Sequence, residues 1–229
     1  MLTERQFRLY APADVQAHVM RLRLTRQYHQ PPLEALARIL EAAEVLADAE
    51  PDVIVFHCTA SSMEAGVEGD RRIVDAIAQR TGCRATSTAS AVAAALEALG
   101  ARKVVLVSPY QPASHQHEIE FLAEMGVEVV GGRAMAFRSG AYPTTSPGEW
   151  LEIVRSVASP AADAYFLSCT NIQSMEVIEP LERELGKPAL ASNQATLWYC
   201  LRLLGLEDVN SRLGRLFGMK APARAAAPA

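Results

Sequence analysis

The sequence contains the same unit twice: an apolar run, a cysteine followed by threonine, and then a helical pattern. The first unit spans 52–62 and contains Cys58, and the second spans 164–174 and contains Cys169. In both, β-branched or aromatic residues give way abruptly to small polar residues, which is typical of a buried parallel strand that runs into a loop. The cysteines are about half the chain apart. We therefore expect two related halves that each present a thiol to one cleft.

A second internal repeat lies after each unit. Residues 81–100 resemble residues 185–205, at nearly the same offset as the cysteines. Each stretch begins near a glycine, continues through small polar residues suited to cap a helix, and becomes an apolar helical pattern. Because strand and helix patterns alternate along the whole chain, the predicted fold class is α/β with mainly parallel sheets.

The repeat predicts where the halves divide. We expect lobe one to contain residues 1–100 together with about 192–218, and lobe two to contain residues 101–191. The last stretch, 219–229, is rich in alanine and proline and is expected to be a disordered tail.

The repeat also predicts a gap in lobe one. The apolar run 103–107 opens lobe two, and its counterpart in lobe one falls at or before Met1. The first strand of lobe one and its loop are therefore expected to be missing. Without that strand, one edge of the lobe-one sheet would have no partner.

Two other segments carry weaker patterns. Loose alternation over Val15 to Leu24 predicts a strand. The run 127–130 predicts a short strand, and the stretch 131–147 predicts a long irregular segment of the kind that often binds ligands.

Composition argues against some binding partners and indicates which cellular compartment to expect. The chain has 50% hydrophobic residues, 21% charged residues and a net charge of −4. The absence of a basic run argues against nucleic acid and against an anionic membrane surface. No leader or long apolar stretch is present, so the cytoplasm is the expected compartment, with the four cysteines reduced. Neither a Cys-x-x-Cys pair nor a His pair predicts a metal site.

The cysteine loops are the candidate catalytic machinery. Parallel α/β sheets bind ligands beyond the carboxyl ends of their strands, where Cys58 and Cys169 are expected to lie. A thiol beside a helix start should have a lowered pKa. One cysteine could then attack carbon or accept a proton while the other donates a proton from the opposite face. The alternative is that each cysteine is a small buried hydrophobe, but matched positions in a repeat favour chemistry.

Polar residues at the same strand ends are candidates for carboxylate binding through hydroxyls and free amides. Each of them could instead only cap a helix or pack in the core. The six candidates are Thr59, Ser61, Tyr110, Thr170, Asn171 and Asn193.

Two further cysteines and three histidines are expected to have no part in the chemistry. Cys83 falls in a loop, and Cys200 falls on an apolar helix face. His57 lies within a strand, so a hydrogen-bonded core histidine is the expected reading. His115 and His117 are expected to be solvated near a helix start.

The paired Cys-Thr loops, the Ser-Pro-Tyr110 turn and the Ser192-Asn193 turn resemble the aspartate/glutamate racemase superfamily. The nearest branch is that of maleate cis-trans isomerases and arylmalonate decarboxylases, and the resemblance covers Thr3 to Gly218. It implies two pseudo-symmetric Rossmann-like lobes, an active-site cleft between them, no cofactor, no metal and a homodimer.

The resemblance also implies roles for individual residues. Cys58 would attack the alkene, Cys169 would handle the proton, and Tyr110 would hold a substrate carboxylate. Arylmalonate decarboxylases keep only the second cysteine, so the presence of both favours isomerisation or racemisation. The first motif reads Cys-Thr-Ala-Ser-Ser where maleate isomerases commonly have Cys-Thr-Ser-Gly-Ser, which argues against maleate itself as the substrate.

Three hypotheses follow. The first is a cofactor-independent isomerase or racemase of a small carboxylic or dicarboxylic acid that uses both Cys58 and Cys169. The second is a decarboxylase of malonate-type acids that uses Cys169 as the proton donor. The third is a truncated relative that binds a carboxylate without turning it over.

Overall fold

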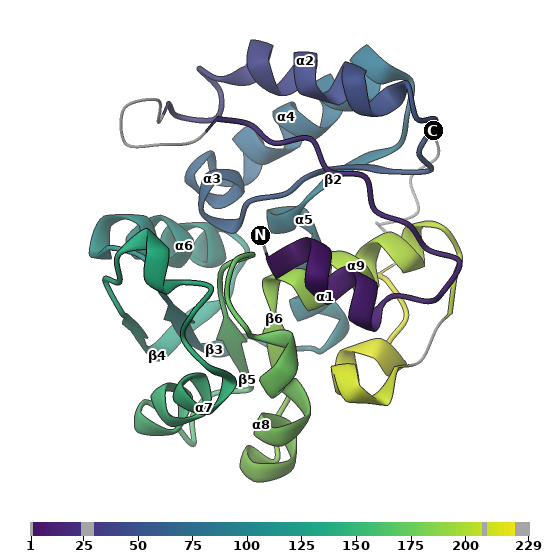
Figure 1. The fold of residues 1–229 in the computed structure, drawn as a ribbon. Coiled ribbons are helices and arrows are strands. Elements are labelled where there is room, and N and C mark those ends of the chain that lie inside the picture. Colours follow the sequence, from purple (N-terminus) through teal and green to yellow (C-terminus); the bar gives the residue numbers. More distant parts are fainter. Residues whose placement is uncertain (1, 24–29, 208–209, 223–229) are drawn as a thin grey trace.

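The computed structural model describes residues 2–23, 30–207 and 210–222, and its strands and helices alternate as predicted (Figure 1). The first half contains α1 (Leu2–Tyr10), α2 (Leu36–Ala47), β1 (Ile54–Phe56), α3 (Thr59–Glu64), α4 (Gly66–Thr81), β2 (Ala85–Ser87) and α5 (Thr88–Ala98). The second half contains β3 (Lys103–Ser108), α6 (Pro112–Glu124), β4 (Glu128–Ala134), η1 (Ser139–Ala141), α7 (Pro147–Ser156), β5 (Ala164–Leu167), η2 (Met175–Val177), α8 (Ile178–Leu185), β6 (Ala189–Ala191), α9 (Ser192–Leu203), η3 (Ser211–Leu213) and η4 (Arg215–Gly218). The α/β class with parallel sheets is confirmed, and the proposed division into lobes stays a prediction.

The larger sheet has four parallel strands in the order β4-β3-β5-β6. Its central strand β3 is buried on both faces. Leu106 packs in the cluster around Trp198 of α9, while Val105 and Val107 pack in the cluster around Trp150 of α7. Figure 1 shows α7 and α8 on one side of this sheet and α9 on the other. Burial of both faces explains why this strand is a continuous apolar run in the sequence.

Strand β4 is longer than predicted, because it continues through two glycines to Ala134. The pairing with β3 shifts register between Val104 and Val105. Beyond that shift, Gly132 has φ 145°, and a Cβ there would lie 1.9 Å from the Leu106 carbonyl oxygen. Only glycine permits this close approach between the two backbones. Residues 131–134, which the sequence predicted as irregular, therefore form part of a paired strand.

The smaller sheet contains only β1 and β2, which are parallel. Ile54 and Phe56 pack against α2 and α4 in a third core cluster. The Ile54 amide donates to the Arg84 carbonyl at 2.8 Å, so the backbone groups of Val55 face the opposite edge. No strand among the described residues pairs with that edge.

The predicted strand over Val15 to Leu24 is wrong for the residues described, 15–23, which have no strand partner. Leu24 lies outside the described residues. This segment instead forms one wall of a cavity of about 780 Å³ beside β1, opposite Ile39 and Leu46 of α2. An alternating pattern forms a strand only where a neighbour supplies hydrogen bonds, and none is provided here.

The predicted disordered tail is only partly described. Residues 223–229 lie outside the described residues. Residues 219–222 are described, and the Met219 carbonyl accepts hydrogen bonds from Trp198 Nε1 at 3.2 Å and Arg202 Nε at 2.9 Å. In the described part of the chain, no helix is both long and apolar enough to cross a bilayer.

Candidate active site

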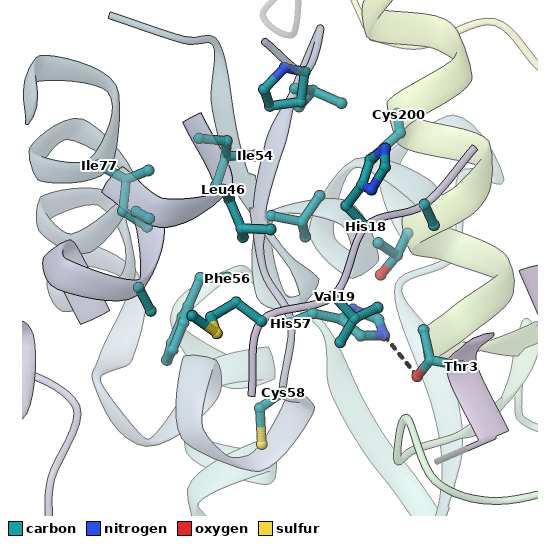
Figure 2. Close-up of a pocket in the computed structure, with 18 of the residues that line it drawn as sticks. Thr3, His18, Val19, Leu46, Ile54, Phe56, His57, Cys58, Ile77 and Cys200 are labelled. Carbon is teal, nitrogen blue, oxygen red and sulfur yellow. Dashed lines mark hydrogen bonds between the residues drawn. The ribbon is translucent and has the colours of Figure 1, made fainter. Parts of the chain in front are cut away.

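Cys58 lies at the junction between β1 and α3 and is half-buried. Its backbone is extended, with φ −161° and ψ 115°, and its carbonyl accepts hydrogen bonds from the Ser62 amide at 2.9 Å and the Ser62 hydroxyl at 2.8 Å. Together with Ser61 it borders the cavity, at the end that Figure 2 shows beyond His57. Cys58 is therefore the accessible thiol of the pair.

Cys169 follows β5 and is 4% exposed. Its φ of 130° is unusual for a residue with a side chain. Its amide donates to Ser192 Oγ at 3.1 Å, and its sulfur accepts from the Asn171 amide at 3.3 Å. Burial raises the pKa of Cys169 to about 12, which is the reverse of the lowering expected at a helix start. The desolvation of a thiolate in this site outweighs the stabilisation by neighbouring amides.

Tyr110 links the two cysteines electrostatically. Its hydroxyl is buried, and burial raises the pKa of Tyr110 well above its ordinary value, with a further rise from negative charge on Cys169. Negative charge on Cys58 raises the pKa of both Tyr110 and Cys169 further. The three groups thus lie close enough for a charge on one to act on the others, although Cys169 and Tyr110 are not part of the cavity wall.

Ser192 joins the two cysteine loops. Thr59 Oγ1 donates to Ser192 Oγ at 2.8 Å, and the same oxygen accepts from the Cys169 amide. Thr59 is fully buried by this contact and holds the start of α3 against the start of α9. The sequence predicted the Ser192-Asn193 turn as a helix cap at the ligand-binding ends of the strands, but it did not predict this bridge, because the long-range partners of Ser192 leave no local signal.

Asn193 is the centre of a buried polar network. Its Nδ2 donates to Thr170 O at 3.0 Å and to Gln6 Oε1 at 2.5 Å. His57 Nε2 lies 3.0 Å from Asn193 Oδ1, and Thr88 Oγ1 lies 2.9 Å from His57 Nδ1. Since the amide oxygen only accepts, Nε2 carries the proton and Nδ1 accepts from the threonine hydroxyl. The Asn193 side chain is thus occupied by protein partners.

Burial lowers the pKa of His57 to about 4, so the ring is neutral near pH 7. The prediction that this histidine is hydrogen-bonded is confirmed, but the ring is half-buried and lines the cavity. The prediction that His115 is solvated is wrong, because His115 is 9% exposed and its Nδ1 hydrogen-bonds Ser108 Oγ at 2.8 Å. His117 is half-buried.

Helix α1 lies across the second cysteine loop, which the sequence did not predict. Thr3 Oγ1 donates to Thr170 O at 3.1 Å and lies 3.1 Å from His57 Nε2, a contact drawn in Figure 2. The Leu2 amide donates to Asn171 Oδ1 at 3.2 Å. The Asn171 side chain therefore holds α1, while its backbone amide faces the sulfur of Cys169.

The two remaining cysteines differ in position. Cys83 is half-buried in the turn after α4. Cys200 lies on α9 in the cavity wall, as Figure 2 shows, and burial raises its pKa to about 12. No group of three or more His, Cys, Asp or Glu side chains in the described ranges is placed to hold a metal ion.

The arrangement can move protons and form a bond to carbon. A buried thiol with a pKa of about 12 is almost entirely protonated near pH 7, so Cys169 can donate a proton. The half-buried Cys58 can be reached from the cavity and can act as a nucleophile.

Comparison with known proteins agrees with this chemistry. The family model described as arylmalonate decarboxylase matches residues 5–217. A maleate isomerase from Nocardia farcinica is 31% identical over 178 residues, covering 75% of this chain and 71% of the relative. An arylmalonate decarboxylase from Bordetella bronchiseptica is 29% identical over 156 residues, covering 67% of this chain and 65% of the relative.

Solved structures extend the comparison to the fold. A Nocardia farcinica maleate cis-trans isomerase mutant with a covalently bound succinylcysteine intermediate superposes with a TM-score of 0.83 at 25% identity, covering 94% of this chain and 91% of that one. A crystal structure of arylmalonate decarboxylase gives a TM-score of 0.76 at 26% identity, covering 80% of this chain and 82% of that one. The expected resemblance is confirmed, and the chain is an enzyme of the isomerase or decarboxylase type. Since the family model spans nearly its whole length, the chain belongs to the arylmalonate decarboxylase family.

Proposed function

We propose that the chain is a cofactor-independent isomerase of a small unsaturated dicarboxylic acid, with Cys58 as the nucleophile and Cys169 as the proton donor and acceptor. The observation that carries this proposal is the Ser192 hydroxyl, which accepts from Thr59 Oγ1 beside Cys58 at 2.8 Å and from the Cys169 amide at 3.1 Å, and so joins the two cysteine loops. The succinylcysteine in the Nocardia farcinica relative supports it, because that adduct is what thiol addition to a four-carbon unsaturated diacid would leave.

In the proposed reaction, the Cys58 thiolate forms a C–S bond to one alkene carbon. The π electrons move to the neighbouring carbon, which takes the proton from the Cys169 thiol. Rotation about the resulting C–C single bond follows. The Cys169 thiolate then removes a proton from that carbon, the double bond reforms in the other geometry, and the C–S bond breaks to return the Cys58 thiolate.

The high pKa of Cys169 keeps it protonated and suits the role of proton donor. The Tyr110 hydroxyl stabilises the Cys169 thiolate that forms transiently. For the substrate carboxylates we propose the hydroxyl of Ser61 and the polar groups of Thr170, which border the cavity near Cys58. Thr59 and Asn193 support these loops through their buried hydrogen bonds.

Proton NMR of the purified protein with maleate and with substituted cis-dicarboxylates tests the proposal, because the vinyl protons of the two isomers resonate apart. Conversion by the wild type and its loss in both Cys58→Ala and Cys169→Ala is the expected result. Cys83→Ser is the matched control, since that cysteine is remote from the cluster. Full activity in either single variant would refute the pair.

A second candidate is decarboxylation of an aryl-substituted malonate. It is favoured by the apolar wall of the cavity beside Cys58, where Phe56, Ile54 and Leu46 could contact an aromatic substituent. Release of carbon dioxide from an α-aryl-α-methylmalonate distinguishes the two. For a decarboxylase, activity should survive Cys58→Ala and disappear in Cys169→Ala.

A further inference from the structure

A buried carboxyl group lies beneath the second cysteine loop and has no part in the reaction above. Glu118 of α6 is fully buried, and its Oε1 accepts a hydrogen bond from Ser168 Oγ. The Ser108 hydroxyl, which contacts His115 Nδ1 at 2.8 Å, lowers the pKa of this carboxyl against the larger rise caused by burial. Ser168 directly precedes Cys169, and Ser108 lies two residues before Tyr110. The carboxyl is therefore hydrogen-bonded to the strand end that carries Cys169.

The second oxygen of this carboxyl lacks a partner. Glu118 Oε2 is buried with no hydrogen bond among the described residues, and the nearest basic group is His115 Nδ1 at 3.8 Å. That nitrogen is already bonded to Ser108. A buried anionic oxygen without a donor is costly, so the neutral acid is favoured and burial raises the pKa of Glu118 to about 8.

The titratable groups around Glu118 come from four segments. His115 lies on α6 itself, Tyr110 follows β3, Cys169 follows β5, and Tyr142 packs edge-on against Tyr110 with ring centroids 6.0 Å apart. Charge on Glu118 raises the pKa of the two tyrosines and of Cys169. Negative charge on Cys58 likewise raises the pKa of Tyr110 and of Cys169.

The backbone conformation at Cys169 requires support from neighbouring residues. Its φ of 130° is a conformation that a residue with a Cβ adopts only when its surroundings enforce it. Two contacts flank the turn: Ser168 Oγ to Glu118 on one side, and the Cys169 amide to Ser192 Oγ on the other.

We propose that Glu118 is a positioning residue for Cys169: it anchors the turn through Ser168, and any charge it acquires keeps Cys169 in the thiol form. The proposal deepens the proposed function, in which that thiol supplies the proton, but it concerns the thiol itself and is tested without substrate.

Glu118→Gln tests it, because glutamine can still accept from Ser168 but cannot become charged. The rate of iodoacetamide alkylation at each cysteine is followed by peptide mass spectrometry between about pH 6.5 and pH 9.5. Near pH 6.5 the wild-type carboxyl is neutral, so the Cys169 rates in wild type and variant should be equal. Near pH 9.5 the Glu118 carboxyl of the wild type is ionised. Cys169 should then be alkylated about tenfold faster in the variant, because its pKa is lower there by about one unit.

Two controls separate charge from loosened structure. Cys200, which is half-buried in the cavity wall and has its pKa raised to about 12, should show the same rates in both proteins at every pH. Glu120→Gln, on the exposed face of the same helix, should leave Cys169 unchanged. A variant-to-wild-type ratio of one at both pH values, or the same elevated ratio at both, would overturn the proposal.

A second variant covers the case in which Glu118→Gln does not fold, as judged by circular dichroism. Ser168→Ala keeps the carboxyl but removes its donor, so ionisation of Glu118 becomes still less favourable. The Cys169 rate near pH 9.5 should then rise in the same direction by a smaller factor. An unchanged or slower rate at that pH would equally contradict the role of Glu118. If the wild type shows no isomerase turnover while the alkylation rates follow these expectations, the proposed isomerase reaction fails and the role of Glu118 stands.

Discussion

The two cysteine loops begin from the same local sequence and end in different surroundings. Cys58 follows a strand in a two-stranded sheet with an unpaired edge, is half-buried and borders a cavity. Cys169 follows a strand in a four-stranded sheet, is 4% exposed, and its sulfur accepts from the Asn171 amide. Burial keeps the Cys169 thiol protonated, while partial exposure leaves Cys58 accessible, and this contrast is the basis of the two different roles that we propose for them.

The surroundings differ because the sheets differ. In the four-stranded sheet, β5 lies between β3 and β6 and packs on both faces. In the two-stranded sheet, β1 has β2 on one side and packs mainly against α2 and α4. The cavity of about 780 Å³ lies beside β1 and is lined by residues of β1, α2 and α9.

The largest expected effect is on turnover. Cys58→Ala should abolish isomerisation, because no C–S bond can form. Cys169→Ala should lower kcat by about 10²–10⁴-fold, the usual contribution of a positioned acid or base. Steady-state kinetics by NMR, with unfolding curves to show that each variant is folded, measures both. Equal and small decreases of kcat in the two variants would contradict the different roles proposed for Cys58 and Cys169.

The next effect concerns two buried carboxyls, one beside each sheet. Burial raises the pKa of Glu118 from 4.5 to about 8 and that of Asp70 from 3.8 to about 6. A raised pKa means that the folded state binds the proton more tightly, so this stability is present at low pH and is lost as pH rises through the folded pKa.

We therefore expect the wild type to lose stability relative to Glu118→Gln between about pH 4.5 and pH 8, by a few kcal/mol. The loss relative to Asp70→Asn should be smaller and complete by about pH 6. Urea unfolding at several pH values checks both. A wild-type curve parallel to that of Glu118→Gln across this range would show that the carboxyl is ionised in both states.

A smaller effect compares matched valines. Val105 at the centre of β3 is fully buried, and Val55 at the centre of β1 is half-buried beside the cavity. At about 0.8 kcal/mol per buried methylene, Val105→Ala should lower the free energy of unfolding by about 2 kcal/mol, and Val55→Ala by less than about 1 kcal/mol. Denaturant unfolding of both variants measures the difference, and equal losses would mean that the two strands are equally well packed.

The smallest effect tests the bridge between the loops. Thr59→Val and Ser192→Ala each remove the hydrogen bond of 2.8 Å between these hydroxyls. A double-mutant cycle should give a coupling free energy of about 0.5–1.5 kcal/mol. Additive losses would show that the bridge does not couple the cysteine loops.

The sequence predicted the strands and the cysteine loops because their signals are local. Continuous apolar runs mark β1, β3 and β5, and the repeat predicts an unpaired edge at β1. The segment 15–23 was predicted wrongly, since a strand depends on a neighbour that its own residues do not reveal. Gly132 was read as irregular, because a close approach between backbones is invisible in one strand alone.

The supporting residues of the site could not be predicted, because their contacts are long-range. Thr3, Ser192 and Glu118 meet the cysteine loops only after the chain has folded. The raised pKa of Cys169 has the same origin: a helix start suggested a lowered value, and only the burial seen in the fold reverses it.

Intact-mass and peptide mass spectrometry of the Cys169→Ser variant, incubated with a cis-dicarboxylic acid that the wild type isomerises, tests the central claim most directly. After Cys58 adds to the alkene, the neighbouring carbon takes a proton from water in place of the Cys169 thiol, and the variant lacks the thiolate that would remove that proton again. A gain of one molecule of the acid, mapped to Cys58 and absent in the Cys58→Ser/Cys169→Ser double variant, is the predicted result. An unmodified Cys58, or an adduct found only on another cysteine, would contradict the assignment of Cys58 as nucleophile.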